Sequence, residues 1–405
     1  MWNVQVNNVT EIDLECTTFC NLKCPECNRT SDKDLISSIL NTTHITLENC
    51  KTWLKPTELI NLKEVRFCGA IDEALMNPEL TDILDFFLDE FKIKYIDIRT
   101  NGAVRTPAFW TNLVNHLPTN HMIVFGLDGL EDTNHIYRVG AKWEKIINNA
   151  KAFISAGGIA SWQFIEFEHN KHQIEEAKQL AKELGFKEFR LVSSTRPTYS
   201  ENLEHIRKDD KVSALSNRKN KDSNKWMDEQ GPLNDNTPIK KKKSKIKEQS
   251  WAKMNEKDTK SSVQEITLVE KDHDKLKTVI HCENQGHGNG NRILINALAQ
   301  VTPCCFLNGY FHQPYGYNKN IKLEEKGLLP FSFHEDPRLA KLFHKHKNNQ
   351  NDLTAISLEH HTLKEILKGD FFADIQDSWT TKDPIERCLE VCGKDIRDDN
   401  KYELL

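Results

Sequence analysis

The chain has 405 residues, a formal net charge of −5, 38% hydrophobic residues and 28% charged residues. Its length allows one sizeable domain and a smaller one, and the small negative charge gives no reason to expect a nucleic-acid partner. No apolar run is long enough to cross a membrane, and the N-terminal residues lack the basic and apolar regions of a signal peptide, so we expect a cytoplasmic protein.

Six short apolar runs rich in β-branched residues alternate with amphipathic stretches in the first half of the chain. The predicted strands are 11–15, 64–68, 95–99, 122–126, 162–167 and 189–192. The predicted helices lie near 47–54, 79–91, 107–117, 143–156 and 173–184. Strands separated by helices indicate βαβ units and a parallel α/β sheet. Six units suit a partial (βα)6 barrel, whose chemistry lies at the C-terminal ends of the strands.

Residues 202–262 interrupt this pattern. They include the basic run KKKKSKIK at 240–247 and almost no apolar residues, so they cannot bury a core. We interpret the segment as a flexible linker or insertion. The alternative is a basic strip for an acidic partner or nucleic acid, with few aromatic residues for stacking. The predicted regions are therefore a barrel at 1–200, a charged linker at 201–263, and a smaller cysteine-rich α+β domain at 264–405.

Eleven cysteines are the strongest chemical signal in the chain. Because the cytosol keeps thiols reduced, their clustering indicates metal binding rather than disulfides. The first set, Cys20-x-x-x-Cys24-x-x-Cys27, follows the first predicted strand. Three thiolates can bind three irons of a [4Fe–4S] cluster and leave the fourth iron open to a ligand. A structural zinc site with Cys16 as fourth ligand is an alternative that the spacing leaves open.

The segment CNLKCPEC, in its place after the first strand, resembles the three-cysteine loop of the radical S-adenosylmethionine (radical SAM) superfamily. The resemblance implies a partial (βα)6 barrel in which the fourth iron binds the amino and carboxylate groups of S-adenosylmethionine. It also implies one-electron reduction by a partner such as flavodoxin or ferredoxin. The cleaved cofactor then gives methionine and a 5′-deoxyadenosyl radical, which abstracts a hydrogen atom from a substrate.

The loops after the next three strands resemble further motifs of this family. In FCGAIDEALMNPEL, Gly69 and Glu73 match a Gly-rich acidic motif that holds the methionine amino group, although the usual second Gly and the Pro are absent. Asn101 lies in a T-N-G tripeptide expected near a sugar or carboxylate. In FGLDGLEDTNHIYRVG, the resemblance places Asp128 at the ribose hydroxyls and Arg138 at the methionine carboxylate. A plain βα turn and an exposed helical arginine remain alternatives.

The C-terminal cysteines resemble the twitch and SPASM extensions of the family, which hold auxiliary clusters. A short predicted hairpin ends in Pro-Cys, with Ala299 where the family usually has glycine. The four predicted ligands of one auxiliary [4Fe–4S] cluster are Cys282, Cys304, Cys388 and Cys392. Cys305 is a spare that can replace Cys304, and a structural zinc ion is an alternative. There are too few cysteines for two clusters, which favours the smaller twitch form.

The leading hypothesis from the sequence is hydrogen abstraction from a peptide or protein side chain, because family members with auxiliary clusters often act on such substrates. Modification of a small metabolite, such as a sugar, nucleoside or amino acid, is the alternative within enzymes. A non-catalytic, zinc-stabilised α/β scaffold that binds a partner is the alternative outside them.

Overall fold

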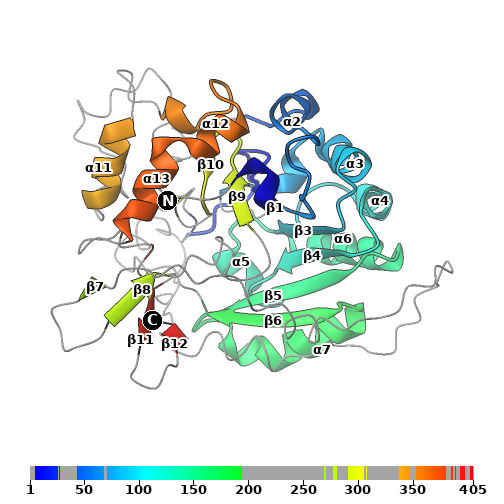
Figure 1. Ribbon diagram of the computed structural model, residues 1–405. Coiled ribbons are helices and arrows are strands. Elements are labelled where there is room, and N and C mark those ends of the chain that lie inside the picture. Colours follow the sequence, from blue (N-terminus) through cyan, green and yellow to red (C-terminus); the bar gives the residue numbers. More distant parts are fainter. Residues whose placement is uncertain are drawn as a thin grey trace, which may run out of the picture.

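The computed structural model describes the barrel in most of its length and the C-terminal region in shorter pieces. The described residues are 5–25, 27, 43–67, 71–193, 269–270, 277–280, 291–304, 307, 337–346, 353–379, 385, 388, 393–396 and 402–404. They form an eight-stranded sheet of order β10-β9-β1-β2-β3-β4-β5-β6 and a four-stranded sheet of order β12-β11-β8-β7 (Figure 1). No helix among the described residues is long and apolar enough to cross a membrane.

The first six strands are parallel, which confirms the predicted α/β barrel sheet. They are β1 (Val9–Leu14), β2 (Glu64–Phe67), β3 (Tyr95–Thr100), β4 (His121–Gly126), β5 (Ala160–Glu166) and β6 (Glu188–Ser193). The helices that follow them are α2 (Leu47–Trp53), α3 (Leu80–Glu90), α4 (Pro107–Leu113), the short α5 (Asn134–Tyr137), α6 (Trp143–Ser155) and α7 (Ile174–Leu184). All six strands and all five longer helices lie where the hydrophobic pattern predicts them.

Local sequence signals set the ends of these helices. The Thr46 hydroxyl accepts a hydrogen bond from the backbone of Asn49 in a capping box at the start of α2. Pro107 occupies the first turn of α4, where its missing N–H costs nothing. Gly185 ends α7 in the left-handed conformation, with φ of 85°. These signals therefore define the starts of α2 and α4 and the end of α7.

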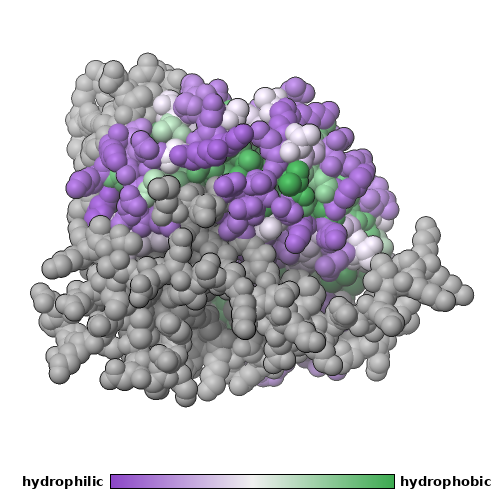
Figure 2. All heavy atoms as spheres, viewed as in Figure 1, coloured by the Kyte–Doolittle hydropathy of each residue, from purple (hydrophilic) through white to green (hydrophobic). Residues whose placement is uncertain are grey.

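The two faces of the sheet differ sharply in polarity. On one face, side chains such as Ile12, Phe67 and Trp162 are fully buried in the main core, and Figure 1 shows the larger helices along this side. The opposite face carries charged pairs, among them Arg292 with Glu11 at 2.7 Å. Separately, the outer surface of the described residues on the side of the molecule seen in Figure 2 is mostly hydrophilic.

The C-terminal region joins the barrel through a hairpin of β9 (Asn291–Ile295) and β10 (Val301–Thr302). Strand β9 pairs in parallel with β1, so this hairpin extends the barrel sheet. The small sheet consists of β7 (Val269–Glu270), β8 (Lys277–Ile280), β11 (Gly393–Ile396) and β12 (Tyr402–Leu404). The remaining helices are α11 (Pro337–His346), α12 (Leu363–Lys368) and α13 (Asp370–Ser378). The predicted linker at 201–263 and its boundaries lie outside the described residues.

Candidate functional site

The loop that follows β1 carries the first cysteine set at the C-terminal edge of the sheet. Cys24 is 8% exposed, and Cys20 and Cys27 are partly exposed. The three thiols share one small contact cluster, separate from the main core, with three larger side chains: Leu22, Tyr137 and Phe167. The pKa of Cys20 is raised to about 12 and that of Cys24 to about 11, chiefly by burial, and Cys27 is a lesser contributor to both shifts.

Cys16 is not part of this group. It is fully buried in the main core, and its thiol donates to the carbonyl oxygen of Ala74 at 3.7 Å. Burial raises its pKa, with further contributions from Asp72 and Cys50. The fourth ligand that a zinc site in this loop needs is therefore not supplied by Cys16.

Three cysteine side chains are a donor set that a [4Fe–4S] cluster can take from a protein. Among the described residues, no three His, Cys, Asp or Glu side chains are placed to hold one metal ion. Thiolates of a cluster bind different irons, so they need not converge on a single point. The three loop cysteines are free of disulfides and lie beside an apolar wall. This arrangement suits a bulky cofactor with one open position.

The loops after β2 and β3 are tied directly to the cysteine loop. The backbone N–H of Glu73 donates to the carbonyl oxygen of Phe19 at 2.8 Å. The Asn101 amide donates to Asn21 Oδ1 at 2.9 Å, and the same nitrogen is 3.9 Å from Cys20 Sγ. Two sequence-predicted cofactor residues are thus brought against the cysteine set. The sequence prediction missed Asn21. The available signal was its polar side chain between two predicted ligands in the cysteine loop.

Glu73 also connects the second loop to the third. Its carboxylate is 2% exposed and accepts from Thr100 Oγ1 and from the backbone N–H of Asn101, both at 2.7 Å. Burial raises its pKa to about 7, although these two hydrogen bonds lower it. A nearby cation would favour the ionised form of this buried carboxyl group and so lower its pKa. Gly69, the other predicted residue of this loop, lies outside the described residues.

Arg138, after α5, lies between Asp128 and Cys24. Its Nε donates to Asp128 Oδ2 at 2.6 Å, and its side chain is 18% exposed. Burial raises the pKa of the Cys24 thiol, while the charge of Arg138 and a hydrogen bond from its side chain lower it. An exposed arginine on a helix is therefore not what the structure shows. Arg138 belongs to the surroundings of the cysteine set.

Asp128 is 0% exposed and points inward. Its second oxygen, Oδ1, accepts from the backbone N–H of Ile165 at 2.7 Å. Burial raises its pKa, and the adjacent Arg138 opposes that shift most strongly. Because both carboxylate oxygens are engaged inside the protein, Asp128 holds Arg138 and the end of β5 in place. Its expected contact with the ribose hydroxyls stays a prediction.

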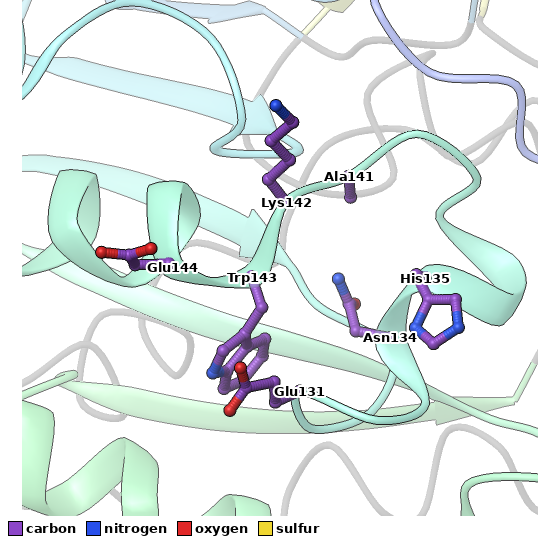
Figure 3. A pocket seen from close by; sticks show the side chains of 7 residues that line it. All are labelled: Glu131, Asn134, His135, Ala141, Lys142, Trp143 and Glu144. Atoms are coloured by element: carbon purple, nitrogen blue, oxygen red, sulfur yellow. The ribbon is translucent and has the colours of Figure 1, made fainter.

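A cavity of about 290 Å³ adjoins this region, between α5 and the start of α6 (Figure 3). Its lining residues are Glu131, Asn134, His135, Ala141, Lys142, Trp143 and Glu144. Asn134 Oδ1 accepts from the backbone N–H of Asp128 at 2.8 Å, so the cavity wall also supports the Asp128 loop. Ala141 in turn packs against the contact cluster of the cysteine loop.

Gly126, at the end of β4, is a site residue that the sequence prediction missed. A Cβ at this position would lie 2.7 Å from Nη2 of Arg138, so the absent side chain makes room for the guanidinium. The available signal was a glycine within a strand, which often marks close approach of another group.

The second cysteine set is described only in part. Cys304 and Cys388 are each 9% exposed in the main core. Cys282, Cys305 and Cys392 lie outside the described residues, so the auxiliary site stays a prediction. The backbone offers one relevant register: β8 pairs with β11 so that Ile280 opposes Gly393. In sequence, Cys282 follows the first of these partners by two residues and Cys392 precedes the second by one.

No protein-family model and no curated protein matches the chain. Among solved structures, SuiB from Streptococcus suis bound to S-adenosylmethionine is similar at 14% identity and TM-score 0.46, over 74% of this chain and 61% of SuiB. The anSMEcpe structure with bound AdoMet and Cp18Cys peptide matches at 15% identity and TM-score 0.36, over 47% of this chain and 54% of that one. BtrN in complex with AdoMet and 2-DOIA matches at 18% identity and TM-score 0.25, over 29% and 45%. The chain thus spans about three fifths of the length of SuiB, and its function has to rest on its own residues.

Proposed function

We propose that this chain is a radical SAM enzyme. Cys20, Cys24 and Cys27 would hold three irons of a [4Fe–4S] cluster, and the fourth iron would bind S-adenosylmethionine. One observation carries this proposal: three cysteine side chains share one contact cluster after β1, and the loops after β2 and β3 hydrogen-bond to the same segment. Parallel strands direct these loops to one edge, which is where α/β barrels place their chemistry.

When bound, the cluster supplies the electron that cleaves S-adenosylmethionine to methionine and a 5′-deoxyadenosyl radical. The protein's own residues bind and orient the cofactor. Glu73, with its raised pKa, is suited to the methionine ammonium group, whose charge favours the ionised carboxylate. Asn101 presents an amide next to Cys20. Tyr137 and Phe167, whose ring centroids are 4.5 Å apart, exclude water beside Cys24.

Hydrogen abstraction from a peptide or protein side chain is the reaction that we propose, with a small metabolite as the alternative substrate. A second [4Fe–4S] site at Cys282, Cys304, Cys388 and Cys392 supports it by the family resemblance. The register of β8 with β11 supports the pairing of the first and last of these ligands. The electron would come from a reductase partner of the flavodoxin or ferredoxin class. The region 264–405 would form this smaller unit, with its hairpin built onto the barrel sheet.

Anaerobic reconstitution tests the proposal. We expect a brown protein with about eight irons per chain that releases 5′-deoxyadenosine from S-adenosylmethionine when dithionite is added. Replacing Cys20, Cys24 and Cys27 with alanine should abolish this product and leave about four irons. The matched control is Cys50→Ala, since Cys50 is a buried thiol of the main core and should not affect iron content. A colourless, zinc-loaded protein that releases no 5′-deoxyadenosine would contradict the proposal.

A further inference from the structure

Asn134 carries a buried hydrogen-bond donor that the fold leaves unused. The residue is 1% exposed, and its Oδ1 accepts from the backbone N–H of Asp128 at 2.8 Å. Only the oxygen of an amide can accept from an N–H, so this bond fixes the group and turns its Nδ2 the other way. No described residue offers an acceptor to that nitrogen. A buried donor without a partner costs free energy, so such a group beside a cavity is a candidate contact for a ligand.

Asn134 lines the cavity of about 290 Å³ that lies between α5 and the start of α6. Figure 3 shows its side chain reaching from α5 toward the chain between Ala141 and Trp143. In the same view, the side chains of Lys142 and Glu144 extend away from it. Neither of them therefore stands between the amide and the start of α6.

A second wall of the cavity is the N-terminus of α6, a helix of 13 residues. The first N–H groups of a helix have no partner within it, and its dipole places partial positive charge there. Lys142 is the N-cap residue, and a lysine ammonium has no acceptor with which to cap the helix. Helix ends of this kind bind anions. The N–H groups of α6 and the donor of Asn134 thus border one space, and Lys142 adds a positive charge to it.

The charged groups at the cavity select the class of anion. Glu131 and Glu144 line it together with Lys142, so negative side chains outnumber positive ones. A dianion such as phosphate would face net repulsion there. A carboxylate carries a single charge, and the two glutamates can accept hydrogen bonds from an N–H or an ammonium group beside it. The lining therefore matches a ligand in which a carboxylate lies next to a nitrogen donor.

We propose that this cavity binds an α-carboxylate with an adjacent nitrogen donor, the group carried by a free α-amino acid and by the C-terminus of a peptide. The carboxylate accepts from Asn134 Nδ2 and from the N–H groups at the start of α6, and the nitrogen donates to Glu131 or Glu144. Ala141 lines the cavity and packs against the contact cluster of the cysteine loop, so the ligand lies beside that loop. The site does not rest on the proposed cluster.

Calorimetric titration of the full chain with small probes tests the site. N-acetylglycine presents the C-terminus of a peptide, glycine presents a free amino acid, N-acetylglycinamide lacks the charge, and inorganic phosphate is a dianion. We expect N-acetylglycine or glycine to bind at least about tenfold more tightly than N-acetylglycinamide and phosphate. The tighter of these two carboxylates identifies the source of the ligand. In a chain with 15N-labelled asparagine, the same probe should shift the side-chain amide resonances of Asn134.

Two variants test whether the Asn134 donor and the helix end hold the ligand. Asn134→Asp keeps an oxygen for the N–H of Asp128 but loses the donor, and should weaken binding about tenfold or more. Lys142→Ser supplies the missing cap, so it should raise the thermal midpoint of the ligand-free chain and yet weaken binding. Lys151→Ser removes the same charge further along α6, outside the cavity, and should change the affinity less than about twofold.

The proposal is overturned if neither carboxylate probe binds, or if N-acetylglycinamide or phosphate binds as tightly. Unchanged affinity in Asn134→Asp and Lys142→Ser overturns it as well, and if Asn134→Asp does not fold, Lys142→Ser alone decides. Displacement of the bound probe by adenosine, which has no carboxylate, would also overturn it, because the cavity would then belong to the proposed cofactor site. None of these measurements requires iron, so a failure here is distinct from a failure of the proposed function.

Discussion

The two cysteine regions of this chain are assembled in different ways. The first set lies within one loop, and the sheet brings the neighbouring loops to it through hydrogen bonds such as Asn101 to Asn21. The second set is spread from Cys282 to Cys392, and only Cys304 and Cys388 are among the described residues. Local spacing defines the first site, whereas pairing between distant strands has to define the second.

This difference teaches which physical rule acts in each region. Parallel strands joined by helices place their C-terminal ends at one edge, so the first site follows from the order of the elements. The second region depends on contacts of very long range, such as β9 against β1 and β8 against β11. Such contacts leave no periodic signal in a single sequence.

The largest expected effect contrasts the two sets directly. Cys24→Ala should abolish 5′-deoxyadenosine formation, because it removes one of three ligands of the cluster that binds S-adenosylmethionine. Cys388→Ala should remove about four irons yet leave this product within about tenfold of the parent. Iron content and 5′-deoxyadenosine are measured on the same reconstituted samples. Equal loss of product in both variants would show that the two sites do not act separately.

The next effect compares ion pairs of the two regions. Asp128→Asn leaves Arg138 partly buried without its anion, so we expect a loss of about 3 kcal/mol in the free energy of unfolding. Glu11→Gln weakens the pair that joins β1 to β9, whose side chains are 19% and 26% exposed, and should cost about 1 kcal/mol. Urea unfolding of the cluster-free chain measures both. A larger loss for Glu11→Gln would reverse the ranking of the two regions.

The barrel was predictable from sequence because its signals are local. Apolar runs alternating with amphipathic stretches predicted the strands and helices to within a few positions, and local caps such as Thr46 set the helix ends in the structure. The pairing of β9 with β1 was not predictable, since it joins residues such as Arg292 and Glu11 that are 281 positions apart. The candidate residues came from motif spacing. The inward direction of Asp128 did not, because burial by β5 is a property of the folded sheet.

A pH effect tests the charged face of the sheet where the regions meet. Burial raises the pKa of Asp13 to about 6, although Arg292 and Arg66 lower it. The folded chain therefore holds this proton more tightly than the unfolded chain, and stability is lost as pH rises from about 4 through 6. Between pH 4 and pH 8 the parent should lose up to about 3 kcal/mol in the free energy of unfolding through this group. Asp13→Asn should not show this loss. Parallel stability curves of parent and variant against pH would contradict this assignment.

The smallest effect concerns the hairpin that leads to Cys304. Ala299 has φ of 62°, a left-handed conformation that favours glycine and costs an alanine about 1 kcal/mol. Its backbone N–H donates to Asn296 and its carbonyl oxygen accepts from Leu358, so the turn cannot relax freely. Ala299→Gly should therefore raise the free energy of unfolding by about 0.5–1 kcal/mol. Ala297→Gly, in the same turn without a positive φ, is the control and should lower it. If both variants lose stability in thermal unfolding, packing of the Ala299 methyl group outweighs its backbone strain, and the hairpin is better adapted to alanine than its backbone angle indicates.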